Sequence, residues 1–457
     1  MRIIILGAGQ VGRTMAERLS TEDNDVTVVD TQPELLKHIQ DRYDIRTVTG
    51  HASHPDVLEK ARIEDADLVL AVTNSDETNM VACQIAHSLF HTPTRLARVR
   101  SAGYLTHPEL FTPEAIPIDF IISPEQLVTR FIENLIEFPG ALQILDFAEG
   151  RAQLVAVRAH YGGGLVGKEL RHINELLPKI DARIVAIYRR KRAIIPTART
   201  VIESDDEVFF LAGKQHIRKV ITAFRHTDKS NRKIIIAGGG NIGMALAKQL
   251  ESIYHVKIIE NNRARGRYLV ESLGKTVVLN GDAADEHLLR EEDIENIDMY
   301  CAVTNDDEVN ILSAMLAKRL GARKVLSIIN RPGYVDLAQG GPVDIAVSPA
   351  QITIGALLAY IRRGDIVRVH SLRRGAAEAI EVIAHGDRET SHVVGREIGE
   401  LSLPEGTTIG VIARGDKLLF PDKHVVIEPE DHVVLFLVDK SHVQDVERLF
   451  QVAITFF

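Results

Sequence analysis

Apolar runs of three to five residues alternate along the first 122 residues with stretches in which apolar positions recur three or four residues apart. Residues 3–6 (IIIL) predict a buried strand, and Val11, Met15 and Leu19 predict the helix that follows it. Strands are likewise predicted over 26–29, 47–48, 68–72, 95–100 and 120–122, and helices around 35–39, 57–62 and 78–90. Strands that alternate with helices are typical of a parallel sheet covered on both faces. The pattern predicts an α/β, Rossmann-like, doubly wound domain.

The same pattern occurs a second time. Residues 3–12 (IIILGAGQVG) return as 234–243 (IIIAGGGNIG), and residues 71–79 (AVTNSDETN) return as 302–310 (AVTNDDEVN). Both echoes are 231 residues apart, as Gly7 and Gly238 are. The second copy predicts strands over 234–237, 256–259, 299–303 and 325–329, with helices from 242 and over 308–320. A preserved spacing over this distance indicates duplication of a whole domain.

A different kind of segment follows each copy. Over about 143–225 and 368–450 the strand–helix rhythm is replaced by short β-branched runs, such as 184–188 and 208–211, and a helix is predicted over 216–224. These segments also repeat each other: VGKE at 166–169 returns as VGRE at 394–397, and SDDEVFFL at 204–211 as PEDHVVLF at 429–436. We therefore predict two Rossmann-like domains (1–125 and 232–350), each followed by a small α+β lobe (140–226 and 368–453). The polar stretch 227–232 is the expected boundary between the halves.

Each Rossmann-like copy opens with the pattern Gly-x-Gly-x-x-Gly. In the first copy Gly7 allows the tight turn, Gly9 lets a phosphate approach the backbone, and Gly12 allows the helix to pack close to the sheet. A pyrophosphate would then lie on the free N–H groups at the positive end of the helix dipole. The second copy has the same glycines at 238, 240 and 243. The alternative is that both turns serve packing only.

An acidic residue ends the second strand of each copy, Asp30 in the first and Glu260 in the second. A carboxylate there can accept hydrogen bonds from an adenosine ribose and would repel a 2′-phosphate. The acids therefore favour a nucleotide role over packing alone, with NAD or another unphosphorylated adenosine ligand preferred to NADP.

Short polar side chains follow the next strands. Thr73-Asn74 and Thr304-Asn305 come directly after apolar runs, where the ligand crevice of a parallel sheet lies. They could contact a ligand, or Asn74, Asp76, Asn305 and Asp306 could cap the next helix, and both roles are compatible.

Two arginines near the predicted strand 95–100 are further candidates for ligand contact. Arg98 and Arg100 share a face of that strand and could pair with a phosphate or stack on adenine, unless the strand is a solvated edge. The second copy has Ile328 opposite Arg98, so the two pockets are expected to differ.

Composition narrows the classes of function. The 457 residues carry a net charge of −9, which argues against nucleic acid and against direct adhesion to anionic lipid. No apolar span of about 20 residues and no signal peptide is recognisable, so membrane association is expected only through a protein partner. The two cysteines, Cys83 and Cys301, are expected as buried thiols in a reducing cytoplasm. The histidines at 51, 54, 87 and 91 have no evident third ligand, so no metal site is predicted.

No catalytic constellation stands out either. The lobes carry no obvious proton donor or acceptor, and no Walker lysine follows the glycines. A binding and regulatory role is therefore favoured, and an NAD-dependent oxidoreductase is the alternative.

Four motifs together resemble the regulator-of-potassium-conductance (RCK) family: GAGQVG with Asp30, GHASHPDVL at 50–58, AVTNSDETNMVACQIA at 71–86 and ISPEQL at 122–127. The resemblance covers essentially the whole chain and implies two RCK N and two RCK C domains. It implies a peripheral subunit on the cytoplasmic side of the inner membrane, assembled as a tetrameric ring beneath a potassium-translocating subunit of the TrkH or TrkG type. Family members bind NAD(H) and adenine nucleotides such as ATP and ADP.

The resemblance also implies the residues that hold the nucleotide. They are Gly7, Ala8, Gly9, Gln10, Val11, Asp30, Thr73, Asn74 and Arg98 in the first copy, and Gly238, Gly239, Gly240, Asn241, Ile242, Glu260, Thr304 and Asn305 in the second. The expected function is nucleotide-dependent gating of potassium uptake.

Overall fold

The computed structural model describes residues 1–21, 24–178, 180–190, 192–225, 232–338, 341, 343–361, 366–372 and 377–452. The chain forms two compact units, Met1–Leu127 with Pro349–Leu357 and Val128–Ser348 with Leu358–Phe457. The predicted boundary at 227–232 lies outside the described residues except for Arg232.

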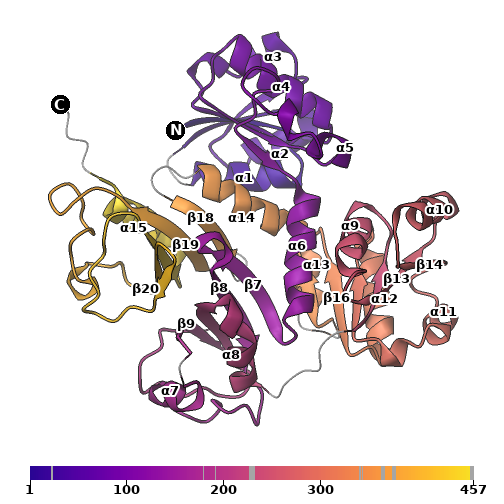
Figure 1. Ribbon diagram of the computed structural model, residues 1–457. Coiled ribbons are helices and arrows are strands. Elements are labelled where there is room, and N and C mark those ends of the chain that lie inside the picture. Colours follow the sequence, from indigo (N-terminus) through magenta and orange to yellow (C-terminus); the bar gives the residue numbers. More distant parts are fainter. Residues whose placement is uncertain are drawn as a thin grey trace. The chain divides into compact units, whose positions relative to one another are not determined.

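The first unit contains a six-stranded parallel sheet in the order β3-β2-β1-β4-β5-β6, and Figure 1 labels the helices α1–α5 around it. Because the order reverses beside β1, the connecting helices cover both faces. The elements are β1 (Arg2–Leu6), α1 (Gln10–Ser20), β2 (Asp25–Asp30), α2 (Pro33–Gln40), β3 (Arg46–Thr49), α3 (Pro55–Lys60), β4 (Leu68–Ala71), α4 (Asp76–Ser88), β5 (Thr94–Arg98), α5 (Ala102–Leu105) and β6 (Phe120–Ile122), and α6 (Pro124–Glu137) follows.

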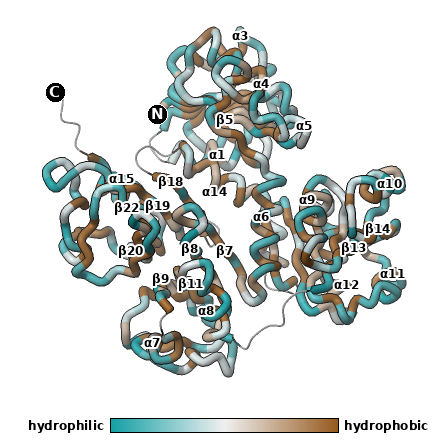
Figure 2. Tube along the Cα trace, in the orientation of Figure 1, coloured by the Kyte–Doolittle hydropathy of each residue, from teal (hydrophilic) through white to brown (hydrophobic). Residues whose placement is uncertain are grey.

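The inner strands β2, β1, β4 and β5 are buried on both faces, which explains their apolar runs. Ile4 and Leu6 pack with Leu58 of α3 and Cys83 of α4 in one core, and the alternate residues of β1 point away from it. Figure 2 shows hydrophobic residues around β5 and mixed polarity along α3 and α4. An amphipathic helix that covers a fully apolar strand is therefore the repeating unit.

The second Rossmann-like sheet has the equivalent order β14-β13-β12-β15-β16-β17. Its elements are β12 (Lys233–Ala237), α9 (Asn241–Leu250), β13 (His255–Glu260), α10 (Arg263–Ser272), β14 (Val277–Asn280), α11 (Glu286–Glu291), β15 (Met299–Ala302), α12 (Asp307–Arg319), β16 (Lys324–Ile328), α13 (Pro332–Ala338) and β17 (Ile345–Val347), and α14 (Pro349–Ile361) follows. The duplicated Rossmann-like fold predicted from the sequence is confirmed.

The lobes are two five-stranded antiparallel sheets, ordered β10-β9-β11-β8-β7 and β18-β19-β22-β20-β21. Read from opposite ends, the two orders are the same. The elements are β7 (Ala141–Phe147), β8 (Ala152–Arg158), α7 (Ile173–Leu176), β9 (Ala182–Arg189), β10 (Arg192–Ile194), β11 (Glu207–Gly213) and α8 (Ile217–Phe224), then β18 (Ile366–Leu372), β19 (Ala377–Ala384), β20 (Thr407–Arg414), β21 (Lys417–Leu419), β22 (Asp431–Leu437) and α15 (Val443–Phe450).

The two lobes contact each other within the second unit. Glu381, which is fully buried, accepts a hydrogen bond from the backbone N–H of Ala148 at 2.9 Å and one from His432 at 2.7 Å. Arg368 donates to the carbonyl of Asp146 at 2.9 Å. Apolar residues of both lobes form one core, including Phe147, Val185, Phe209 and Leu211 of the first lobe and Leu372, Val411 and Phe436 of the second.

Two details differ from the sequence predictions. The strand predicted over 95–100 ends at Arg98, because the chain turns there and Arg100 lies beyond the sheet edge. The elements α5, α6, α10, α11, α13, α14, β14 and β17, and most lobe strands, have no counterpart in the sequence prediction.

Candidate functional site

The carboxyl ends of the central strands in the first sheet bring the predicted site residues together. The register pairs Leu6 of β1 with Val29 of β2 and Ala71 of β4. The glycine turn, Asp30 and Thr73 therefore leave neighbouring strands at one edge of the sheet. In a doubly wound sheet this edge, where the strand order reverses, is where ligands bind.

The three glycines of the first turn have different surroundings. Gly7 has φ +110°, a conformation that side chains rarely adopt, and a Cβ at Gly12 would lie 1.8 Å from the carbonyl oxygen of Gly7. A Cβ at Gly9 would meet nothing within 4 Å. The outer glycines are therefore required by the fold, whereas Gly9 leaves open space beside the first turn of α1, as a bound pyrophosphate requires. The second turn is the same at Gly238 and Gly240.

The acid at the end of the second strand holds the glycine turn in both copies. Asp30 accepts hydrogen bonds from the N–H groups of Ala8 at 2.7 Å and Gln32 at 2.9 Å. Glu260 does the same with Gly239 and Asn262, both at 2.8 Å. A carboxylate has about four acceptor positions, so each acid retains capacity for ribose hydroxyls.

Thr73 is fixed by Asn79, a residue that the sequence analysis did not single out. Asn79 is fully buried in α4 and accepts from the Thr73 N–H at 2.9 Å and hydroxyl at 2.7 Å. Its amide donates to the carbonyls of Thr73 at 3.3 Å and Arg98 at 2.9 Å. One side chain thus ties together the ends of β4, α4 and β5. In the second copy Asn310 makes the same bonds to Thr304 and to the carbonyl of Ile328.

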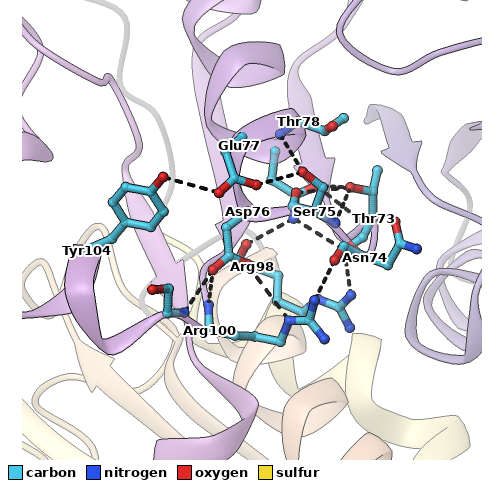
Figure 3. Close-up of polar contacts among 11 residues, drawn as sticks. Thr73, Asn74, Ser75, Asp76, Glu77, Thr78, Arg98, Arg100 and Tyr104 are labelled. Atoms are coloured by element: carbon cyan, nitrogen blue, oxygen red, sulfur yellow. Dashed lines mark hydrogen bonds and ion pairs between the residues drawn. The ribbon is translucent and has the colours of Figure 1, made fainter.

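Arg98 and Arg100 reach the same loop from the end of β5. The guanidinium of Arg98 donates to the carbonyl of Thr73, and that of Arg100 donates to the carbonyl of Asn74 (Figure 3). Burial and the neighbouring charge of Arg100 lower the pKa of Arg98. The buried Nε of Arg98 has no hydrogen-bond partner among the described residues. A donor in this position is available to an anionic ligand.

The helix caps differ from the candidates named from the sequence. In the first copy Ser75 caps α4, with its hydroxyl accepting from the Thr78 N–H at 3.1 Å. Asp76 instead accepts from the N–H groups of Arg100 at 2.9 Å and Ser101 at 2.8 Å, which holds the turn after β5 (Figure 3). In the second copy Asp306 is the cap, as one of the predicted alternatives had it.

The second copy lacks the charged groups beside the loop. Burial raises the pKa of Glu125, and the nearby Arg98 and Arg100 act against that rise. The corresponding positions of the second copy, where ISPEQ becomes VSPAQ, hold Ile328 in place of Arg98 and Ala350 in place of Glu125. A half-buried cation and its nearby carboxylate are thus both replaced by apolar side chains.

The remaining candidates contribute little to this site. The rings of His51 and His54 lie 5.0 Å apart on the surface, and His91 lies beyond the end of α4. No group of three potential metal-binding side chains occurs in the part of the chain that the structure describes. Cys83 and Cys301 are free and buried, and burial raises the pKa of both thiols to about 12. Of the helices within the described ranges, none has the length and apolar character needed to span a bilayer.

Sequence reasoning did not single out Asn79 or Glu125, and it offered Asp76 as a helix cap rather than as the residue that holds the turn after β5. A signal for Asn79 and Asp76 was present, because AVTNSDETN and AVTNDDEVN both retain an acid and an asparagine at these positions. Glu125 gave no such signal, since its position is alanine in the second copy.

The domain content matches known families. Residues 3–124 and 234–349 match the TrkA-N domain, and residues 154–225 and 388–451 match the TrkA-C domain. Among solved structures, the crystal structure of the GsuK RCK domain has a TM-score of 0.62 at 19% identity, covering 98% of this chain and 94% of that chain. The GsuK channel bound to NAD also has a TM-score of 0.62 at 19% identity, covering 98% of this chain and 78% of that chain. These structural likenesses show the shared fold.

Relatives of similar length share much of the sequence. The Trk system potassium uptake protein TrkA of Halomonas elongata is 59% identical over 457 residues and covers 100% of both chains. TrkA of Vibrio alginolyticus is 58% identical over 452 residues, covering 99% of each chain. With its TrkA-N and TrkA-C domains each present twice, the chain belongs to the TrkA family of Trk system potassium uptake proteins.

Proposed function

We propose that this protein is the nucleotide-sensing regulatory subunit of a Trk-type potassium uptake system, and that it gates a potassium-translocating membrane subunit of the TrkH or TrkG type. The proposed ligands are NAD(H) and the adenine nucleotides ATP and ADP. The observation that carries the proposal is the first glycine turn, where open space at Gly9 lies beside the carboxylate of Asp30.

Different residues of the first site bind different parts of the nucleotide. The N–H groups after Gly9 face a pyrophosphate, and Asp30 accepts from ribose hydroxyls. The free Nε of Arg98 supplies a charge-assisted hydrogen bond to a phosphate oxygen. Support for NAD comes from the GsuK channel, a structure of the same fold that is described as bound to NAD.

Gating follows if the ligand binds one arrangement of the assembly better than another. Moving a gate from 1:99 to 99:1 requires about 5.5 kcal/mol of differential binding. In a tetrameric ring with eight Rossmann-like domains, that is less than ~1 kcal/mol for each site. Many weakly discriminating sites can therefore drive a large change in the transporter.

The proposed location is the cytoplasmic side of the inner membrane, with contact to the membrane only through the protein partner. The net charge of −9 supports this, because an acidic surface is repelled by anionic lipid. We further propose that the protein is not an enzyme. Asn79 and Asp76, beside the loop after β4, accept hydrogen bonds from backbone N–H groups, which is a structural arrangement rather than a poised acid or base.

The test is titration of the purified protein with NADH, NAD⁺, ATP and ADP, together with potassium uptake in cells. Asp30→Ala should weaken nucleotide binding by about tenfold, the loss expected for hydrogen bonds to a charged group, and should alter uptake. Asp25→Ala is the matched control, because Asp25 lies at the other, exposed end of β2. It should change neither quantity.

Two results would contradict the proposal. One is unchanged potassium uptake in the Asp30→Ala strain despite lost binding. The other is steady NADH turnover by the purified protein with a panel of small carbonyl substrates, which would support the oxidoreductase alternative.

A further inference from the structure

The second glycine turn differs from the first at its second residue. The first copy has Ala8, and the second has Gly239, where a Cβ would lie 2.3 Å from Cδ1 of Leu269. It would also lie 3.0 Å from Oε2 of Glu260. The methyl group of the first turn would therefore require the side chain of Leu269 to shift in the second.

The acid itself is less accessible in the second copy. Glu260 is 8% exposed, and each of its oxygens accepts a backbone N–H group, from Gly239 and from Asn262. Asp30 makes the equivalent bonds but is only partly buried. Both acids thus hold their turn in the same way, but the side chain of Glu260 is the less accessible of the two to a ligand.

An arginine of α10 contacts the backbone of the second glycine turn. Arg265 of α10 donates from Nε to the carbonyl of Gly239 at 2.7 Å, and its guanidinium lies 4.9 Å from the ring centre of Tyr268. Its Nη2 faces the sulfur of Met244 at 3.7 Å, which is a weak acceptor. Most of its donor groups therefore have no strong acceptor among the described residues, and they lie between the glycine turn and the first turn of α9.

The first copy has an apolar residue at the equivalent position of α2, and its cation beside the turn is Arg13 of α1, at the position of Met244. The equivalent of Arg265, five residues after the acid, is Leu35. Helix α10 carries three arginines and one glutamate, whereas α2 carries one lysine and one glutamate. Conversely, the half-buried cation that the first copy has at the end of β5, Arg98, is Ile328 in the second. The second copy therefore lacks the arginine at the end of β5 and carries one on α10 instead.

We propose that the second Rossmann-like domain binds an adenosine nucleotide that carries a phosphate on its ribose, such as NADP(H), and that Arg265 is the residue that determines this specificity. The inference rests on the proposed function, because it assumes that both glycine turns bind nucleotides. A guanidinium matches a phosphate with two parallel hydrogen bonds, and an arginine near the end of the second strand is the group that accommodates a 2′-phosphate in Rossmann-like sites. This assignment replaces, for the second copy, the preference for an unphosphorylated ribose that its acid predicted.

The test uses the full-length protein with binding at its first site weakened by Gly9→Ala. Calorimetric titration with NADP⁺ and NAD⁺ then measures the second site. NADP⁺ should bind at least about tenfold more tightly than NAD⁺, the ratio expected from one charge-assisted contact. Arg265→Leu, which installs the residue of the first copy, should remove this preference.

Two further variants separate specificity from structure. Arg267→Leu removes an equal charge from an exposed position of α10 and should leave the preference unchanged. In a Gly240→Ala background, which leaves only the first site, Leu35→Arg should improve NADP⁺ binding relative to NAD⁺.

Equal affinities for the two nucleotides in the Gly9→Ala protein would overturn the inference. An equal loss of affinity for NADP⁺ and NAD⁺ in Arg265→Leu would also overturn it, because it would show that Arg265 only holds the carbonyl of Gly239 in place. Failure of both nucleotides to bind the Gly9→Ala protein would also overturn it. The proposed function would still stand in each case if the Gly240→Ala protein bound NAD(H).

Discussion

At the scale of single residues, the glycines of the turn separate binding from folding. Gly12 and Gly7 are fixed by contacts with backbone atoms, whereas Gly9 has none that a methyl group would disturb. Glycines of the same motif therefore have different roles: Gly7 and Gly12 are needed for folding, and we propose that Gly9 is needed for binding. Asn79 shows the same point for a polar residue, because its single buried amide satisfies groups from two loops.

Gly9→Ala should leave the thermal unfolding temperature nearly unchanged and should weaken nucleotide binding at the first site by about tenfold or more. The reason is that its Cβ occupies the open space where a phosphate approaches. Calorimetry and thermal unfolding check both quantities.

Gly12→Ala is the contrasting variant, because its Cβ would meet the Gly7 carbonyl oxygen at 1.8 Å. It should lower the unfolding temperature. If Gly9→Ala were as destabilising as Gly12→Ala, the assigned division of roles would be wrong.

At the scale of elements, one carboxylate joins the end of α9 to the start of β14. Glu251 accepts hydrogen bonds from the N–H groups of Gly274, Lys275 and Thr276 and from the Thr276 hydroxyl. Burial alone would raise the pKa of Glu251, but these bonds outweigh it and hold the pKa at about 2. The first domain has Ser20 at this position, so the link is specific to the second.

Because the folded pKa of Glu251 lies below its ordinary value of 4.5, the charged carboxylate stabilises the fold fully above pH 4.5. That contribution should be lost as the pH falls from 4.5 toward 2. Denaturant unfolding across this range should show a smaller pH dependence for Glu251→Gln than for the wild type. Glu271→Gln, on the exposed side of α10, serves as control. Equal pH dependence in all three proteins would contradict the role given to Glu251.

At the scale of the whole molecule, the two Rossmann-like domains and the two lobes have kept different features since the duplication. The Rossmann-like copies keep the same sheet order but diverge in their pockets. The lobes keep both their order and an internal ion pair: Arg189 binds Asp206 and Glu203, and Arg414 binds Asp431 and Glu428 in the same way. Their contact adds polar groups, including the ring of His370, which lies edge-on to Phe147 with centres 5.1 Å apart.

Burial, with a smaller effect from Arg368, lowers the pKa of His370 to about 4, and the carbonyl and charge of Asp146 act against this. Since the folded pKa lies below the ordinary 6.5, the neutral ring is favoured in the fold and stability is complete above pH 6.5. Stability should therefore fall between pH 6.5 and about 4.

The position of the first lobe that corresponds to His370 is Leu145. The substitution His370→Leu should therefore be tolerated, and it should reduce this pH dependence in thermal unfolding of the full chain. His287→Leu on the exposed face of α11 should not reduce it. An unchanged pH dependence in His370→Leu would show that the ring does not remain neutral at the lobe contact.

The sequence by itself determined the repeated parallel sheets, the glycine turns and the placement of Asp30 and Glu260, because these depend on residue spacing along single elements and their connections. It did not determine the lobe sheets, whose short strands pair with partners far away in the chain. Nor did it show that Asn79 and Asp76 hold the site. Those hydrogen bonds join residues 19 to 25 positions apart, and only the order of the strands brings such residues together. The difference between the two turns was likewise decided by tertiary structure, because Arg265 acts through the carbonyl of Gly239, 26 residues before it.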